Sequence, residues 1–132
     1  MKYSEKLKDP RWQKKRLEIF ERDGWECKSC EKKSNTLHVH HKVYHPTKVP
    51  WDIPSENLIT LCEDCHKNEP AARDEATKRL LAVLYRHYIS WGIDDLADIF
   101  ASIPSEHASN VIHELYTRYE NRDWTKDPIK FG

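Results

Sequence analysis

The sequence predicts a small α+β domain with an N-terminal helix and a C-terminal helical extension. Three observations predict this fold class. Two short apolar runs read as strands, two Cys-x-x-Cys pairs bracket them, and the residues after position 70 carry apolar side chains at helical spacing. At 132 residues the chain is about one domain long. Its hydrophobic fraction is only 38%, so we expect a thin core that gains stability from an additional cross-link.

The first predicted element is a helix over residues 11–22. Asp9 has the side-chain acceptor of an N-cap, and Pro10 suits the first helical position. Asp23-Gly24 predicts the end of the helix, because glycine tolerates a left-handed backbone. The residues before Asp9 are polar and are expected to fray. The expected inward-facing residues are Trp12, Ile19 and Phe20.

The next elements are a strand, a loop, a second strand and a helix. Residues 37–40 alternate apolar and polar side chains, and residues 58–61 form the second apolar run. Three prolines between positions 45 and 54 make the connection a loop. A helix is expected to begin within residues 62–68.

The C-terminal part has a different pattern. Apolar residues at helical spacing predict a helix over 75–91 that ends at Gly92, followed by two shorter helices. We expect these apolar faces to pack on the core or on a protein partner. The sequence therefore divides into a core at residues 1–70 and a helical extension at residues 71–132.

The four cysteines predict a closed metal site. A two-residue gap lets both thiolates of Cys27 and Cys30 point at one ion, and Cys62 and Cys65 complete a tetrahedral set suited to structural zinc. Iron–sulfur ligation and a redox dithiol are the alternatives. The spacing matches no ferredoxin run, and a redox pair is expected beside a βαβ pattern, so zinc is the favoured ion.

Five of the eight histidines lie between positions 38 and 66. The stretch between the two cysteine pairs is 31 residues long, more than the roughly 15–20 of a simple four-cysteine module. His40-His41 ends the first predicted strand, and His66 begins the helix after the second cysteine pair. Adjacent strand residues point to opposite faces, so one histidine of the pair can share a metal with His66 while its neighbour lies elsewhere around a substrate.

The combined motif resembles the HNH endonuclease family. The resemblance rests on residues 37–44 (Leu-His-Val-His-His-Lys-Val-Tyr), residues 56–62 (Glu-Asn-Leu-Ile-Thr-Leu-Cys) and Cys65-His66, and it covers roughly residues 10–69. It implies a treble-clef-like ββα-metal core of the kind found in phage, mobile-element and bacterial nucleases. It also implies metal-dependent hydrolysis of DNA phosphodiester bonds.

The resemblance implies a role for four residues. His40 and His66 would bind a catalytic divalent ion such as Mg²⁺ or Mn²⁺, although relatives often carry aspartate at the first position. His41 would be the general base, and Asn57 would brace the loop and orient that base. Histidine and asparagine supply the proton acceptor and the amide that these roles require.

The remaining expectations concern side chains outside this motif. Between positions 2 and 16 there are seven basic and two acidic residues, which favours a polyanion such as double-stranded DNA, although a solvated helix face is the alternative. The candidate phosphate contacts are Arg11, Lys14, Lys15 and Arg16. His38 and His45 match no motif position and are expected at the surface, and Trp25 and Trp51 are expected to pack on the cysteine knuckles.

Two other functions remain open from the sequence. The chain could be a catalytically silent zinc module that binds DNA or protein, or a regulator that binds a partner through its C-terminal helices. No signal peptide or membrane span is evident, so we expect a cytoplasmic protein with reduced thiols.

Overall fold

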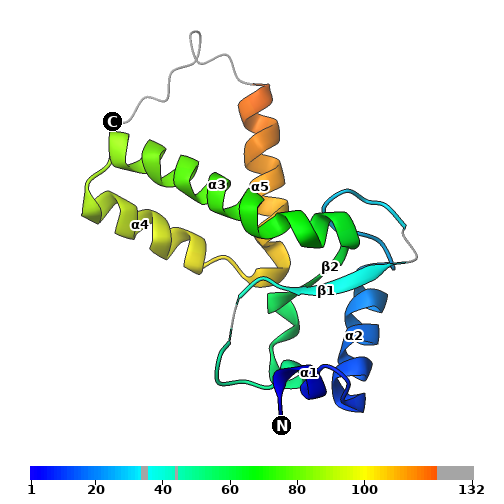
Figure 1. Ribbon diagram of the computed structural model, residues 1–132. Coiled ribbons are helices and arrows are strands. Elements are labelled where there is room, and N and C mark those ends of the chain that lie inside the picture. The colour runs from blue at the N-terminus through cyan, green and yellow to red at the C-terminus, as the bar shows by residue number, and fades with distance from the viewer. Residues whose placement is uncertain (34–35, 44, 122–132) are drawn as a thin grey trace. The chain divides into compact units, whose positions relative to one another are not determined.

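The computed structural model describes residues 1–33, 36–43 and 45–121. Within these residues the fold combines helices with one two-stranded antiparallel sheet, which confirms the α+β class. The helices are α1 (Tyr3–Lys6), α2 (Pro10–Arg22), α3 (Glu63–His87), α4 (Ser90–Ala101) and α5 (Ser105–Glu120), and the strands are β1 (Leu37–His41) and β2 (Leu58–Cys62) (Figure 1). Two compact units are present, the first ending at Arg86 and the second beginning at His87.

Both boundaries of α2 match the sequence prediction. The Asp9 side chain accepts a hydrogen bond of 2.9 Å from the backbone N–H of Arg11, and Pro10 is the first helical residue. The helix ends at Asp23, and Gly24 follows with φ of +71°. The expected fraying before Asp9 is wrong, because α1 forms there with the backbone N–H of Lys2 donating to Glu5.

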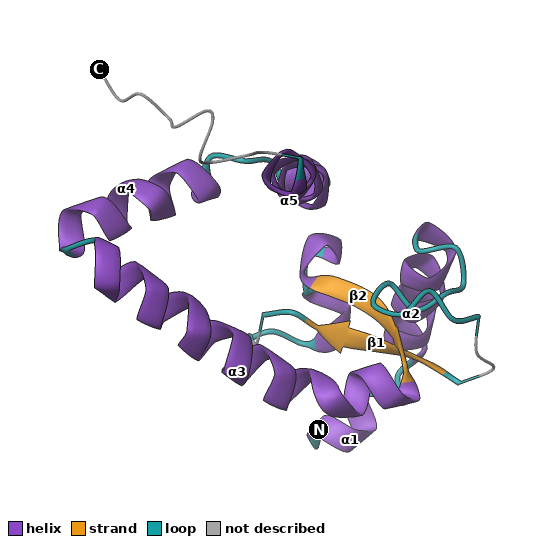
Figure 2. Ribbon diagram, turned by 90° about the horizontal axis from the view of Figure 1, so that it is seen from above, coloured by secondary structure: helices purple, strands orange, loops and turns teal. Residues whose placement is uncertain are grey.

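The antiparallel hairpin of β1 and β2 separates two sets of side chains. Val39 lies opposite Thr60, and His40 lies opposite Ile59. Because successive strand residues alternate, Val39 and His41 share one face and His40 lies on the other. Helix α2 covers the first face, and the first turns of α3 lie at the second (Figure 2).

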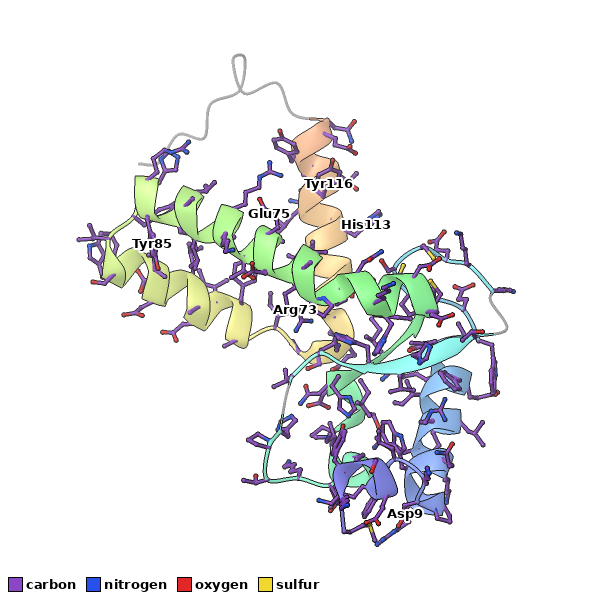
Figure 3. All side chains as sticks on the ribbon, viewed as in Figure 1. Asp9, Arg73, Glu75, Tyr85, His113 and Tyr116 are labelled. Atoms are coloured by element: carbon purple, nitrogen blue, oxygen red, sulfur yellow. The ribbon has the colours of Figure 1, made fainter. Side chains whose placement is uncertain are left out.

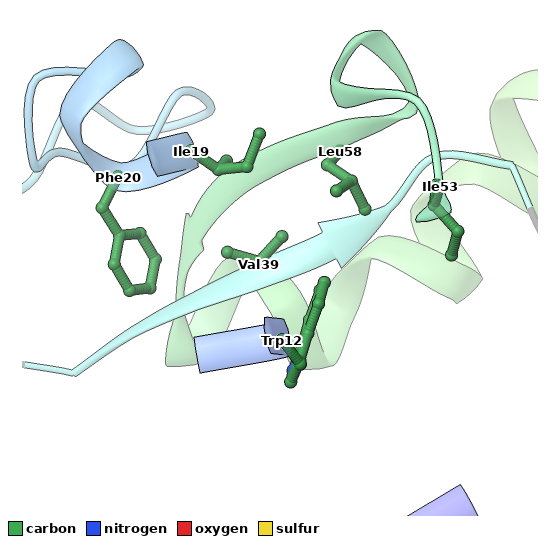
Figure 4. Packing of buried hydrophobic residues seen from close by; sticks show 6 residues of the cluster. All are labelled: Trp12, Ile19, Phe20, Val39, Ile53 and Leu58. Atoms are coloured by element: carbon green, nitrogen blue, oxygen red, sulfur yellow. The ribbon is translucent and has the colours of Figure 1, made fainter. Parts of the chain in front are cut away.

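The main core fills the face of the hairpin that α2 covers. The three residues predicted to face inward are almost fully buried, with exposed fractions of 4% for Trp12, 1% for Ile19 and 6% for Phe20. They pack against Val39, Ile53 and Leu58 (Figure 4). Their burial removes apolar surface from water, which fixes α2 on the sheet.

The described residues of the C-terminal part depart from the predicted helix boundaries. Helix α3 is continuous from residue 63 to 87 and contains Pro70, whose fixed φ is compatible with a helix although its ring offers no N–H. The division at residue 70 remains a prediction. Gly92 does not end a helix but lies inside α4, where a Cβ atom would come within 3.2 Å of the Tyr88 side chain. Among the described residues, every helix is too short or too polar to span a bilayer.

The expectation that two tryptophans pack on the cysteine knuckles is wrong. Trp25 packs on Phe20 with ring centroids 5.4 Å apart and donates its indole N–H to Glu21. Trp51 packs against the α2 core and lies under the guanidinium of Arg11. The aliphatic side chains of Leu61 and Ile59 pack next to the cysteines instead.

Candidate metal centre and histidine cluster

The four cysteine sulfurs form a site that can hold zinc. Their Sγ atoms all lie within 4.8 Å of one another, and those of Cys30 and Cys62 are 3.8 Å apart. A zinc–sulfur distance of about 2.3 Å places the sulfurs of a tetrahedral site about 3.8 Å apart. All four cysteines are free, so the sulfurs are not joined in disulfides.

Backbone hydrogen bonds shape the first cysteine knuckle. The N–H of Cys30 donates to the sulfur of Cys27 at 3.5 Å, and the N–H of Lys28 donates to the carbonyl of Thr60 at 3.0 Å, which ties the knuckle to β2. Burial alone would raise the pKa of Cys27. Hydrogen bonds from backbone N–H groups, including that of Cys30, outweigh burial and lower the pKa to about 6. Cys27 is therefore readily a thiolate, the form that binds metal.

The second cysteine knuckle, Cys62 to Cys65, joins β2 to α3. Cys62 ends β2 and directly precedes α3, and its sulfur accepts a hydrogen bond of 3.5 Å from the N–H of Cys65. A sulfur at this position acts as a helix cap. The side-chain hydrogen bond with Cys62 is the largest cause that raises the pKa of Cys65, to about 12, because it holds the proton on the Cys65 thiol. Metal binding at this site would require that proton to leave.

The knuckle fixes the first turn of α3, which brings His66 to the sheet. The rings of His66 and His40 are nearly perpendicular, with an angle of 81° and centroids 5.4 Å apart. Two imidazoles bound tetrahedrally to one ion at about 2.1 Å would have centroids roughly 5 Å apart. The pair predicted to share an ion is therefore close in space.

His38 is a correction to the sequence reading. It was expected at the surface, but its ring stacks on that of His66 at 4.9 Å and 17°. His38 and His40 are two residues apart on one strand, so both reach the face at which α3 lies. The near-parallel stack therefore adds a third imidazole to the face that carries His40 and His66.

Unpartnered ring nitrogens mark the histidine cluster. The buried Nε2 atoms of His38, His40 and His41 have no hydrogen-bond partner among the described residues. Burial is the main cause that lowers the pKa of His40, His41 and His66. These imidazoles are therefore neutral near pH 7, the state in which a ring nitrogen binds a metal or accepts a proton.

His41 lies on the opposite face of β1 from His40. Its ring stacks on Trp12 with centroids 5.5 Å apart and an angle of 19°. Burial, and then coulombic repulsion from His45 and His66, lower the pKa of His41. His40 and His66 thus lie on one side of β1, and His41 lies on the other.

Asn57 braces the loop after His41, but its amide contacts a different histidine. Its Nδ2 lies 2.8 Å from Nε2 of His45, and its carbonyl accepts a hydrogen bond of 2.8 Å from Lys42. His45 is therefore the partner of Asn57 and is not a free surface residue. Sequence reasoning missed it, since the loop between the strands gives no periodic signal.

The basic residues of α2 have varied surroundings. Arg11 pairs with Asp9 at 2.8 Å, and Arg16 donates to Gln13 and lies over the ring of Phe20. Lys14 is exposed and Lys15 is half-buried. Nothing in these contacts tests the predicted binding of phosphate, which stays a prediction.

Part of the first unit matches a known protein family. Residues 26–71 match the family model of the HNH endonuclease domain. Such a domain indicates a nuclease or a related function on nucleic acid.

One curated relative matches part of the chain. The Zorya protein ZorE of Escherichia coli strain Crooks is 35% identical over 63 residues, which cover 45% of this chain. The chain spans 16% of the length of that relative. No solved structure matches the chain significantly.

Proposed function

We propose that the chain is a metal-dependent endonuclease that hydrolyses DNA phosphodiester bonds. One observation carries this proposal: His40 and His66 face each other across the hairpin and α3, and the buried Nε2 of His40 lacks a partner among the described residues. The match of this segment to the HNH endonuclease family supports the same function.

His41 is the proposed general base. Its lowered pKa keeps the ring neutral near pH 7, as a base that takes a proton from water requires. Its Nε2 is buried near the stack with Trp12, so we assign the accepting role to Nδ1 and the hydrogen to Nε2. The flat contact with Trp12 restricts the ring and keeps Nδ1 at a fixed position.

His40 and His66 are the proposed protein ligands of a divalent ion. Two imidazoles fill part of a coordination sphere and leave positions for water and a phosphate oxygen. When bound, the ion would polarise the phosphate and stabilise the leaving oxygen. Imidazole favours zinc, nickel or iron more than magnesium, so the metal requires a direct test.

Asn57 and His45 support the base through the loop. The amide of Asn57 holds His45, and its carbonyl holds the backbone immediately after His41. We therefore propose that Asn57 positions the loop and acts on His41 indirectly. The four cysteines have the separate role of holding structural zinc, which keeps His66 at the sheet.

The test is cleavage of supercoiled, linear and single-stranded DNA with Mg²⁺, Mn²⁺, Ni²⁺, Co²⁺ or Zn²⁺. We expect His41→Ala to lower the cleavage rate by about 10²–10⁴, since it removes a general base. His107→Ala is the matched control, because His107 is exposed on α5 in the second unit and should leave the rate unchanged. Equal rates for wild type and His41→Ala would refute the assigned base. No cutting with any metal would favour a silent DNA- or protein-binding module.

A protein partner is a second proposal, specific to the C-terminal helices. Trp91 on α4 and Tyr116 on α5 are exposed by 64% and 57%, and Ile99 and Ile112 are exposed by 58% and 54%. Large exposed apolar side chains on helices are typical of association surfaces. Analytical ultracentrifugation of the wild type and of Trp91→Glu tests self-association. An apparent molecular mass of the wild type that does not change with concentration would exclude it.

A further inference from the structure

A small cavity opens on the histidine face of the hairpin. Its volume is about 130 Å³, well below the roughly 300–1,000 Å³ of sites for drug-sized ligands. A group as small as a phosphate suits it better than a nucleobase with its sugar. The residues that line it are Lys28, Ser29, His40, Lys42, Ile59, Leu61, Glu69 and Arg73.

We infer that this cavity is a subsite for a DNA backbone phosphate, held by Arg73, Lys42 and Lys28. The inference rests on the proposed nuclease function and names the residues that would hold its substrate. The three cations come from three separate elements, which are α3, the end of β1 and the first cysteine knuckle. None of them belongs to the basic helix on which the sequence placed the DNA contacts.

Arg73 is already held in place for this role. Arg73 lies on α3 (Figure 3). Its Nη1 donates a hydrogen bond of 2.6 Å to the carbonyl of Lys42, and its Nε lies 3.4 Å from Glu69 Oε1. The guanidinium has five N–H donors, so these two contacts leave others for a phosphate oxygen. A held guanidinium loses little freedom on binding, and its planar fork matches the oxygens of a phosphate.

The charges of the cavity suit one phosphodiester. The lining holds three cationic residues and one carboxylate, Glu69, while Glu26 outside the lining lies 3.9 Å from Lys28, so a positive balance of one remains. A phosphodiester carries one negative charge and would be attracted without full neutralisation. His40 lines the same cavity, so a phosphate bound here lies beside a proposed metal ligand. The subsite would thus hold the phosphate to be cut or its neighbour.

The experiment measures binding of a 20-base-pair DNA duplex by fluorescence anisotropy in the His41→Ala protein, with salt varied from 50 to 200 mM. We expect Arg73→Gln to weaken binding about tenfold, as the loss of a charge-assisted hydrogen bond predicts. The slope of log affinity against log salt should fall by about one, because one phosphate contact is lost.

The matched control is Arg79→Gln, which removes the same charge from the same helix at an exposed residue that does not line the cavity. It should retain most of the affinity. Lys14→Gln with Lys15→Gln tests the α2 surface in parallel. The thermal unfolding midpoint and the zinc content of each variant show whether the domain stays folded.

The results separate this inference from the proposed function. If the wild type cuts DNA while Arg73→Gln binds with unchanged affinity and salt slope, the subsite is refuted and the nuclease stands. If the His41→Ala protein binds no duplex, or if Arg79→Gln loses as much affinity as Arg73→Gln, the subsite is also refuted. If the wild type binds but never cuts, a loss specific to Arg73→Gln still supports the subsite, and the nuclease proposal fails.

Discussion

The two faces of the β1–β2 hairpin use the same ten residues for different purposes. The face toward α2 buries Val39 and Leu58 against Ile19 in a closely packed apolar core. The opposite face carries His38 and His40, whose buried Nε2 atoms lack hydrogen-bond partners among the described residues. Strand alternation therefore places Val39 and Leu58 in the core and His38 and His40 on the other face, although His41 on the α2 face also has an unpartnered Nε2.

The comparison also shows that each face has its own anchor. On the α2 face the anchor is side-chain packing, supplemented by Arg22, which donates to the carbonyls of Ser55 and Leu58. On the α3 face the anchor is the cluster of four cysteine sulfurs. Loss of zinc should therefore lower the stability of the fold more than any single core substitution.

The largest expected effect is the loss of a zinc ligand. We expect Cys62→Ser to abolish zinc binding and to unfold at least the histidine face, because structural zinc contributes folding energy directly. Zinc content by mass spectrometry and near-ultraviolet circular dichroism would measure both changes. Asp64→Ala is the control, since Asp64 is exposed within the same knuckle. If the Cys62→Ser protein kept its fold and its metal, the packing face alone would suffice for stability.

A substitution in the core should have an intermediate effect. Ile19→Ala removes a side chain that is 99% buried, which should lower the free energy of unfolding by about 2–5 kcal/mol. Urea denaturation measures this, with Leu17→Ala as the control, because Leu17 is 55% exposed on the same helix. Zinc content should not change. Loss of zinc in Ile19→Ala would show that the two faces are not separate.

The smallest expected effect is a shift in pH dependence. Burial and the charges of His45 and His66 lower the pKa of His41 below its usual range, so its neutral form is lost only as pH falls through that lowered value. His45→Gln removes one of these charges, and the pKa of His41 should rise. The acid limb of the cleavage profile should move to higher pH by the same amount.

The direct measurement is an NMR titration of the His41 ring in wild type and in His45→Gln. A matched control is His113→Gln, which removes a histidine exposed on α5. A pKa of His41 that stays the same in His45→Gln, or that falls, would contradict the electrostatic role given to His45.

Much of the fold follows from local chemistry in the sequence. The N-cap at Asp9, the turn at Gly24 and the two strands were predicted correctly, because capping groups and side-chain alternation act over a few residues. The cysteine pairs also predicted a metal site, since a two-residue gap fixes how two thiolates can point. The continuity of α3 through Pro70 was missed, because the local preference against proline in helices outweighed the signals on either side.

The sequence by itself determined which residue types were present for zinc and imidazole chemistry, and that His40 and His41 lie on opposite sides of a strand. Only the tertiary structure decided that His38 stacks on His66, that Asn57 holds His45, and that Arg73 comes to the carbonyl of Lys42. These contacts join residues 12 to 31 positions apart in the chain. Periodicity and capping describe neighbours along the backbone, whereas such contacts depend on how α3 and the loop are placed against the sheet.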